Sequence, residues 1–187
     1  MSDEILRVSK FLSLVLRHKP ELIGLTLDQN GWAGVEDLIR LANQHGTRLN
    51  GTRLTRPLLM QVVADNEKKR FALSDNGERI RASQGHSVKV DLGLPPALPP
   101  EILYHGAASR FLESILAGGL HSANRQHVHL SPDVATAIRV GQRHGIPVVL
   151  VIRSGEMAAA GHTFFLSANG VWLTERVPME FISVAAR

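Results

Sequence analysis

The chain has 187 residues, 44% of them hydrophobic, so it can bury a core as one domain or as two small ones. It contains no cysteine, which excludes disulfides, thiolate catalysis and cysteine-ligated zinc and which fits a reducing compartment. No apolar run approaches the roughly 20 residues that span a bilayer, and the start, Met1-Ser2-Asp3-Glu4, does not resemble a secretion signal. These features predict a soluble, cytoplasmic protein.

The net charge of +4 is unevenly distributed along the chain. Residues 1–90 hold 14 Lys and Arg against 10 Asp and Glu, whereas residues 91–187 hold 7 of each. The positive excess therefore lies entirely in the first half. A bias of this size suits a nucleic-acid partner, although charge alone does not identify one.

Apolar residues recur at helical spacing at the start of the chain and predict a first helix. Its buried face is expected to consist of Ile5, Val8, Leu12, Val15 and Leu16. The helix is expected to end at the stretch Leu16-Arg17-His18-Lys19-Pro20. Proline lacks an N–H and disfavours a helical residue before it, so the helix cannot continue through this point.

Two further helices and a hairpin are predicted before residue 91. Helical spacing continues over residues 35–42, after a turn at Gly31-Trp32. A third helix is expected to begin at Thr55, a good N-cap, with Pro57 in its first turn. Residues 71–74 and 79–82 flank Asp75-Asn76-Gly77 and are typical of a β-hairpin. Three helices and a terminal hairpin predict a winged-helix-like lobe, a shape common among nucleic-acid-binding proteins.

The segment 92–100 contains four prolines and predicts an extended linker between a domain of residues 1–91 and one of residues 101–187. After the linker, four strands are predicted, at 102–105, 128–130, 148–152 and 171–173. Helices are predicted between the first three of them, near 109–117 and 133–142. Gly118-Gly119 is expected to stop the first of these helices, and Ser131 to cap the second. The predicted fold class is therefore α+β.

The basic stretch at residues 17–19 has two interpretations. Positive charge at a helix C-terminus can simply complement the helix dipole. It can also form an anion site, and similar clusters recur at residues 68–70, 125–129 and 143–144. Repeated placement of Arg beside His or Lys favours a polyanion, most plausibly phosphate. Arg70 also lies directly before a predicted strand, which would fix the direction of its side chain.

Two histidine motifs in the second half are also ambiguous. His127 and His129 would share one face of a strand, which raises the question of a metal site. The nearest acid is Asp133 and Arg125 lies two residues away, so we expect no metal. His105 at a predicted strand end is followed by Gly106, where the backbone could approach a ligand closely, but such a pair is as often structural. Phosphate loops of the Walker or dinucleotide type and nucleophile-elbow motifs are absent.

Several motifs occur in the order found in one known family, and together they cover nearly the whole chain. They are Lys10-Phe11-Leu12-Ser13, Leu16-Arg17-His18-Lys19-Pro20, Gly31-Trp32, Lys69-Arg70-Phe71, Gln84-Gly85-His86-Ser87, Leu103-Tyr104-His105-Gly106, Arg125-x-His127-Val128-His129-Leu130-Ser131, Val140-Gly141-x-Arg143-His144-Gly145 and Asn169-Gly170-Val171-Trp172-Leu173-Thr174. With these motifs the chain closely resembles the RNA 2′-phosphotransferase family, the tRNA 2′-phosphotransferases of tRNA splicing and their bacterial relatives.

The resemblance implies a winged-helix N-terminal lobe and a C-terminal lobe of the ADP-ribosyltransferase fold. It implies that an internal RNA 2′-phosphate is transferred to NAD, the co-substrate. The phosphate first displaces nicotinamide to give an ADP-ribosylated RNA 2′-phosphate. The ribose 2″-hydroxyl then attacks phosphorus, which gives 2′-hydroxyl RNA and ADP-ribose 1″,2″-cyclic phosphate. The expected partners are this RNA and NAD, with no metal and no membrane, and we expect a monomer.

The resemblance also implies roles for individual residues. Phosphate binding and catalysis would fall to Arg17, His18, Arg70 and Arg125. The NAD pocket would involve His105, Gly106, His129, Ser131, Arg143, His144, Asn169 and Val171. Contacts to RNA would come from Lys19, Lys69, Gln84 and His86. One departure is Ala107, where the family commonly has a hydroxyl residue, so one neutral hydrogen bond to NAD, worth about 0.5–1.5 kcal/mol, is expected to be missing.

Three other functions compete with this interpretation. A winged-helix nucleic-acid-binding module would bind its target without consuming NAD. An ADP-ribosyltransferase acting on nucleic-acid phosphate ends would share the same site and stop after the first step. A metal-dependent hydrolase would lose its activity to a chelator.

Overall fold

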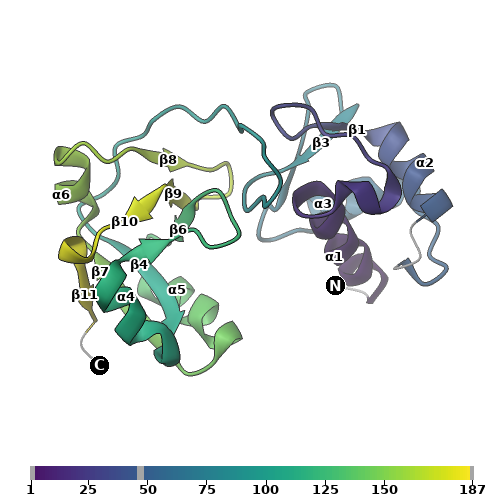
Figure 1. The fold of residues 1–187 in the computed structure, drawn as a ribbon. Coiled ribbons are helices and arrows are strands. Elements are labelled where there is room, and N and C mark those ends of the chain that lie inside the picture. Colours follow the sequence, from purple (N-terminus) through teal and green to yellow (C-terminus); the bar gives the residue numbers. More distant parts are fainter. Residues whose placement is uncertain (1–2, 46–48, 186–187) are drawn as a thin grey trace. The chain divides into compact units, whose positions relative to one another are not determined.

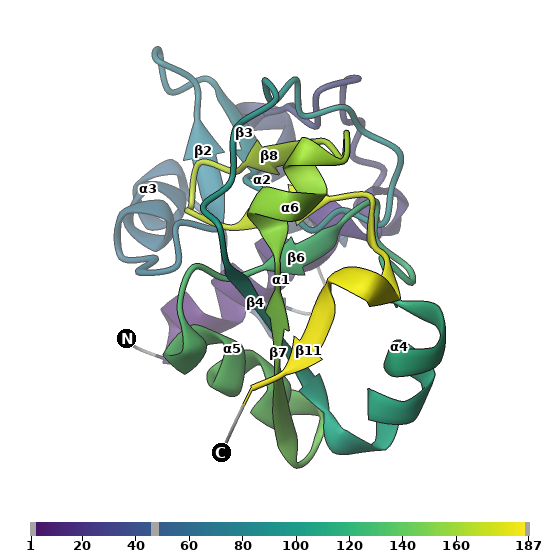
Figure 2. The same cartoon turned by 90° about the vertical axis from the view of Figure 1, so that its left-hand side faces the viewer.

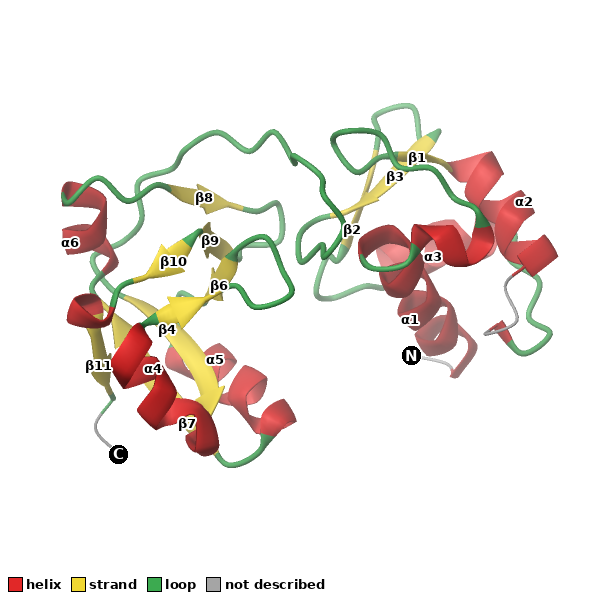
Figure 3. Ribbon diagram, in the orientation of Figure 1, coloured by secondary structure: helices red, strands yellow, loops and turns green. Residues whose placement is uncertain are grey.

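The structure is a computed structural model that describes residues 3–45 and 49–185. The chain divides into two compact units, Met1–Gly93 and Leu94–Arg187, and each has its own hydrophobic core (Figure 1). The division falls inside the proline-rich segment 92–100. Both units combine helices with small antiparallel sheets, which confirms the α+β class (Figure 3). In the part of the chain that is described, no helix is both long and apolar enough to cross a membrane.

The first helix, α1 (Asp3–Arg17), buries every apolar residue that its sequence periodicity assigns to the core. It also buries Phe11 and the polar Ser9. Acidic residues occupy its first turn and Arg17 its last, as the helix dipole favours. A 3₁₀ turn, η1 (Pro20–Ile23), follows directly, so the prediction that α1 ends before Pro20 is confirmed.

Two further helices pack with α1 in the first unit. The helix α2 (Val35–His45) buries Val35, Leu38 and Ala42. The helix α3 (Arg56–Ala64) begins at the predicted cap, where the Thr55 side chain accepts a hydrogen bond from the N–H of Leu58. These helices confirm the predictions made from apolar spacing and capping.

A three-stranded sheet completes the first unit, with strand order β1-β3-β2. The strands are β1 (Ala33–Gly34), β2 (Phe71–Leu73) and β3 (Arg79–Ala82), and neighbours are antiparallel. Phe71 pairs with Ala82 and Leu73 with Ile80 across the predicted hairpin, which is confirmed. Gly77 in the turn has a φ of 69°, a left-handed conformation that glycine adopts without strain.

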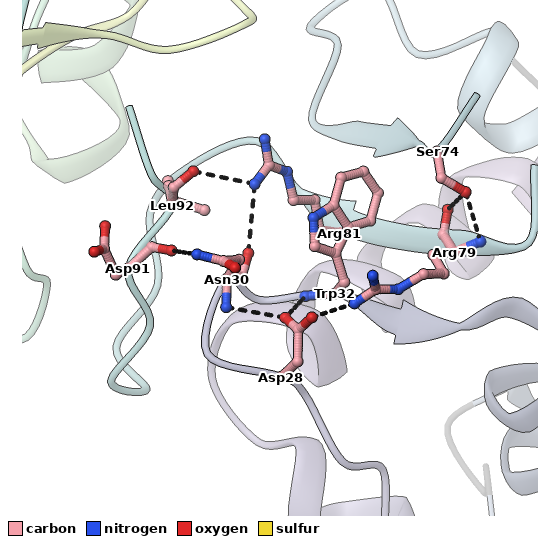
Figure 4. A network of polar contacts seen from close by, with 8 residues as sticks. All are labelled: Asp28, Asn30, Trp32, Ser74, Arg79, Arg81, Asp91 and Leu92. Carbon is pink, nitrogen blue, oxygen red and sulfur yellow. Dashed lines mark hydrogen bonds and ion pairs between the residues drawn. The ribbon is translucent and has the colours of Figure 1, made fainter. Parts of the chain in front are cut away.

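A polar network ties the turn before β1 to this sheet (Figure 4). Asp28 accepts hydrogen bonds from the N–H groups of Asn30 and Trp32, both at 2.9 Å, and forms an ion pair with Arg79. The Trp32 ring lies near two guanidinium groups, at 4.5 Å from that of Arg81 and 5.6 Å from that of Arg79. Arg81 also donates to the carbonyl of Leu92 at 3.1 Å, so the network holds the end of the first unit in place.

The second unit is built on two three-stranded antiparallel sheets. One has the order β11-β7-β4, with β4 (Leu103–Ala108), β7 (Pro147–Ile152) and β11 (Ile182–Val184). These strands lie side by side in Figure 2. The other has the order β6-β9-β8, with β6 (Val128–Leu130), β8 (Phe164–Leu166) and β9 (Trp172–Thr174). Tyr104 and Ser131 join the two sheets through a bridge in which each N–H donates to the other's carbonyl, at 2.9 and 2.8 Å.

Helices and short elements surround these sheets. The helix α5 (Val134–Gly141) packs on β4 and β7 and continues into a 3₁₀ turn, η4 (Gln142–His144). The helix α4 (Leu112–Gly118) follows a 3₁₀ turn, η3 (Ser109–Phe111), and ends at Gly119, as predicted. The remaining elements are β5 (Leu120–His121) paired with β10 (Arg176–Val177), α6 (Ser154–Ala159) and η5 (Met179–Phe181).

Two sequence predictions for this unit were wrong. The strand expected to end at His105 continues to Ala108, because β7 pairs with it along its whole length. The N-cap of α5 is Asp133 and not the predicted Ser131. The Asp133 side chain accepts a hydrogen bond from the N–H of Thr136 at 2.7 Å. Ser131 lies two residues before this cap, and its backbone is paired with Tyr104 in the bridge between the sheets, so the helix begins only after Asp133.

Candidate functional site

In the first unit, the basic end of α1 meets the residues that precede β2. The guanidinium Nη2 of Arg17 donates to the carbonyl oxygen of Arg70 at 3.4 Å. The backbone N–H of Arg70 donates to the Asn66 side chain at 3.4 Å, and Asn66 in turn donates to the Ser9 hydroxyl on α1 at 3.2 Å. Asn66 and Ser9 are both buried. The structure therefore brings two of the predicted phosphate ligands, Arg17 and Arg70, to one place.

Ser83 at the end of the hairpin holds the same turn from the other side. Its hydroxyl donates to the carbonyl of Lys69 at 2.7 Å, and its N–H donates to the carbonyl of Arg70 at 2.8 Å. Lys69 has a φ of 42°, an unusual conformation for a residue with a side chain. These bonds fix the backbone that carries Arg70. No pattern in the sequence predicted the roles of Asn66 and Ser83.

The loop of residues 84–87 returns to the end of α1. The N–H of Ser87 donates to the carbonyl of Arg17 at 2.9 Å, and the Ser87 hydroxyl lies 3.0 Å from Nδ1 of His18. His18 is half-buried at this position. The predicted pair Arg17 and His18 is thus attached to the loop that contains the predicted residues Gln84 and His86.

His86, which was expected to contact RNA, does not face solvent. Its side chain is only 2% exposed, and Nε2 lies beside Gly31. Within the described residues, Nε2 has no hydrogen-bond partner. Burial, followed by the nearby charges of Arg17, His18 and Arg81, lowers the pKa of His86 to about 4. The ring is therefore neutral near pH 7 and acts as part of the interior.

The other residues expected to contact RNA remain accessible. Lys19 and Lys69 are exposed, and Gln84 is half-buried in the loop next to His86. Arg125, the fourth expected phosphate ligand, belongs to the second unit. It is exposed in the loop before β6, where its N–H donates to the carbonyl of Ser122 at 3.0 Å.

In the second unit, His105 is anchored to the neighbouring sheet. Its Nδ1 lies 3.0 Å from the carbonyl oxygen of His129. Because a carbonyl can only accept, Nδ1 carries the hydrogen, which leaves Nε2 as an acceptor in the neutral ring. Burial lowers the pKa of His105, although the bond to the His129 carbonyl opposes this shift. The bridge between Tyr104 and Ser131 lies next to this contact, so His105, His129 and Ser131 come together where the sheets meet.

Gly106 serves a packing role that the sequence analysis did not anticipate. A Cβ on Gly106 would lie 1.8 Å from the carbonyl oxygen of Ala137 on α5 and 2.9 Å from the backbone nitrogen of Gly141. The free space at Gly106 is therefore filled by α5 and is not open to a ligand. Ala107 is buried and lies on the same face of β4 as His105, because side chains alternate along a strand.

The remaining residues assigned to the nucleotide pocket fall into two groups. Asn169 and Val171 belong to a turn organised by the buried Ser167, whose hydroxyl lies 2.8 Å from the Asn169 side-chain oxygen and from the Val171 carbonyl. This turn leads into β9, and Trp172 pairs with Leu130 next to Ser131. Arg143 and His144 are exposed in η4, after α5, which packs on β4.

His127 and His129 were also considered as ligands of a metal ion. The ring of His127 packs edge-on against Phe165, with centroids 5.7 Å apart. Across residues 3–45 and 49–185, no group of three or more His, Asp or Glu side chains is arranged to hold a metal ion.

Comparison with known proteins identifies the family. Residues 3–176 match the family model described as RNA 2′-phosphotransferase, Tpt1 / KptA family. The chain belongs to this family. A probable RNA 2′-phosphotransferase of Agrobacterium fabrum is 58% identical over 178 residues, which cover 95% of this chain and 93% of the relative. Similarly named relatives are 56% identical in Pseudomonas aeruginosa (95% of each chain) and 52% identical in Hahella chejuensis (98% and 96%).

Proposed function

We propose that this chain is an NAD-dependent RNA 2′-phosphotransferase. Membership of the Tpt1 / KptA family supports phosphotransfer from RNA. The observation that carries the proposal is that Arg17 and His18 at the end of α1 meet the backbone of Arg70, through bonds that join three separate segments of the first unit, residues 9–18, 66–70 and 83–88. Two arginines and a histidine held in this way are suited to a phosphate, since guanidinium groups match phosphate oxygens in geometry and charge.

The proposed reaction has two steps. An oxygen of the RNA 2′-phosphate forms a bond to the anomeric carbon of the nicotinamide riboside as the bond to nicotinamide breaks. The ribose 2″-hydroxyl of the resulting ADP-ribosylated RNA then attacks phosphorus, and the RNA 2′-oxygen leaves and gains a proton. The products are 2′-hydroxyl RNA, ADP-ribose 1″,2″-cyclic phosphate and nicotinamide, as the family resemblance implies.

The first unit supplies what the first step requires. The attacking phosphate is already an anion, so this step needs alignment of the phosphate more than it needs a strong base. Arg17 and Arg70 would fix the phosphate, because the backbone of each residue is held by hydrogen bonds to other segments. Arg125 would add a third guanidinium, an assignment that rests on the resemblance of its motif.

The second step concentrates negative charge on the phosphoryl oxygens. The guanidinium groups of Arg17, Arg70 and Arg125 would stabilise this charge. One proton leaves the attacking hydroxyl and one reaches the departing 2′-oxygen. His18 is the only side chain of the proposed catalytic set that ordinarily titrates near neutral pH, so we assign this proton movement to it.

The second unit is proposed to bind NAD, which supplies the electrophilic ribose carbon and the nicotinamide leaving group. The residues fit a nucleotide in one specific respect, since the half-buried neutral ring of His105 keeps an acceptor at Nε2. Ser131 is bridged to Tyr104, the residue before His105, and the turn that contains Asn169 and Val171 leads into β9, where Trp172 pairs with Leu130. We propose that this unit is ADP-ribosyltransferase-like and that the first unit is winged-helix-like.

One incubation tests the proposal. The purified chain is mixed with a short RNA that carries one internal 2′-phosphate, with and without NAD, in the presence of a chelator. NAD-dependent loss of the phosphate together with a cyclic-phosphate product is the expected result. A persistent ADP-ribosylated RNA would instead indicate an enzyme that stops after the first step, and RNA binding without NAD consumption would indicate a binding module.

A further inference from the structure

Ser87 closes the motif Gln84-Gly85-His86-Ser87, but the family resemblance gave it no role, and it makes contacts at the proposed phosphate site. Its hydroxyl oxygen lies 3.0 Å from Nδ1 of His18 and 3.5 Å from the carbonyl oxygen of Arg17. Its backbone N–H donates to that same carbonyl at 2.9 Å, and the N–H of Val88 does so at 3.3 Å. The Ser87 side chain thus stands between the His18 ring and the backbone of the residue before it.

The position of Ser87 is fixed by its neighbours. His86 is buried beside Gly31 and anchors the loop in the interior of the first unit. Gly85 has a φ of 84°, a conformation suited to glycine, which lets the chain turn into this anchor. The backbone of Ser87 is thereby held next to the end of α1, with its exposed hydroxyl at the His18 ring.

We propose that Ser87 is a positioning residue that sets the tautomer of His18 for the second step of the reaction. The inference rests on the proposed function, because it assigns His18 a proton-transfer role. In the proposed arrangement the hydroxyl donates its one hydrogen to the Arg17 carbonyl, 3.5 Å away, and its oxygen accepts the hydrogen on Nδ1 of His18, 3.0 Å away. Nδ1 stays protonated, and Nε2 is the nitrogen that gains and loses the proton.

This arrangement serves both protonation states of His18. In the imidazolium, Nδ1–H would donate to Ser87 and Nε2–H would donate to the departing 2′-oxygen of the RNA. After that transfer the neutral ring keeps its hydrogen on Nδ1, and the lone pair on Nε2 can accept the next proton. The contacts of Ser87 do not change between the two states, so no rearrangement accompanies proton transfer.

The tautomer can be measured without any turnover. We would label the full chain with ¹⁵N-histidine, record long-range ¹⁵N–¹H correlations above the titration of His18, and assign its signals with a His18→Gln variant. The expected spectrum shows a protonated Nδ1 and an unprotonated Nε2. Protonated Nε2 in the unmodified chain would overturn the inference while leaving the phosphotransferase proposal intact.

Two substitutions then separate positioning from folding. Ser87→Ala is expected to change the tautomer distribution and to slow conversion of the ADP-ribosylated RNA by about tenfold or more, a part of what general acid–base catalysis contributes. Ser87→Thr keeps the hydroxyl and should restore both properties, and Ser74→Ala, which removes an exposed hydroxyl in the hairpin turn, should change neither. An unchanged tautomer and rate in Ser87→Ala would also overturn the inference.

Discussion

In the first unit, the candidate residues are held by side-chain hydrogen bonds between distant parts of the chain, whereas in the second unit they are held by backbone pairing and close packing. The Arg17 guanidinium donates a hydrogen bond to the Arg70 carbonyl, and the Ser87 hydroxyl is hydrogen-bonded to the His18 ring. His105, by contrast, is set by the meeting of two sheets, and Gly106 by its contact with α5. Replacing one side chain should therefore impair function in the first unit and folding in the second.

The largest effect is expected at Gly106. In Gly106→Ala the new Cβ would overlap the Ala137 carbonyl, so α5 must move away from β4. We expect a loss of about 3 kcal/mol or more in the free energy of unfolding, at the upper end of overpacking effects. Thermal or denaturant unfolding measures this loss. Gly118→Ala is the control, since a Cβ there would meet no atom within 4 Å, and equal stability of the two variants would refute the packing role.

Arg70→Ala tests whether a substitution in the first unit impairs function and leaves folding intact. The variant keeps the Arg70 carbonyl that accepts from Arg17, so the fold should survive while the phosphate loses a guanidinium. We expect phosphate removal to slow by roughly 10²- to 10³-fold, as for the loss of one transition-state donor. Arg40→Ala, which removes a surface ion pair with Asp37, is the matched control. Near-normal turnover in Arg70→Ala would exclude the proposed site.

His86 should make the first unit sensitive to acid. Its pKa is about 4 in the folded state and near 6.5 when unfolded, so below pH 6.5 the unfolded chain binds a proton that the folded chain does not. The free energy of unfolding should therefore fall by up to about 1.4 kcal/mol per pH unit between pH 6.5 and 4. His86→Gln, compared with the unmodified chain in urea unfolding across this range, should show a shallower dependence. If the free energy of unfolding of His86→Gln fell equally steeply with pH, the acid sensitivity would come from other groups.

The smallest effect is expected at two helix caps, one in each unit, which form a closely matched pair. Thr55 caps α3 in the first unit and Asp133 caps α5 in the second, each through its side chain. Replacing either with Ala should cost about 1 kcal/mol of stability. The hydrogen bonds from Thr136 lower the pKa of Asp133, so its contribution should be lost as the pH falls through that lowered value, whereas the Thr55 contribution should not depend on pH. The free energies of unfolding of both variants, measured at two pH values, distinguish the two contributions.

Local patterns predicted much of the first unit because its elements depend on neighbours in sequence. The buried face of α1, the Thr55 cap and the hairpin at residues 71–82 each follow from spacing, a side-chain oxygen or a turn motif. The extent of β4 could not be predicted in this way. Its last residues, Gly106, Ala107 and Ala108, have little strand preference, and pairing with β7 keeps them extended.

The candidate site was predictable only in its charged members. The resemblance assigned roles to Arg17, His18 and Arg70. In the structure the Arg17 guanidinium donates to the Arg70 carbonyl, and His18 follows Arg17 and lies beside Ser87. Asn66 and Ser83 carry no signal in the sequence, because their roles arise from contacts with residues 57 and 14 positions away. The burial of His86, which was expected to contact RNA, could not be predicted for the same reason, since burial depends on tertiary packing.

The setting of Trp32 between the guanidinium groups of Arg79 and Arg81 has a practical consequence. The chain has two tryptophans, Trp32 in the first unit and Trp172 in the second. Each unit therefore contains its own intrinsic fluorophore. In a Trp172→Phe chain, the emission of Trp32 would report only on the network around Asp28, and the reciprocal Trp32→Phe chain would report on β9. The order in which the two halves lose structure can thus be followed optically, without attaching a dye.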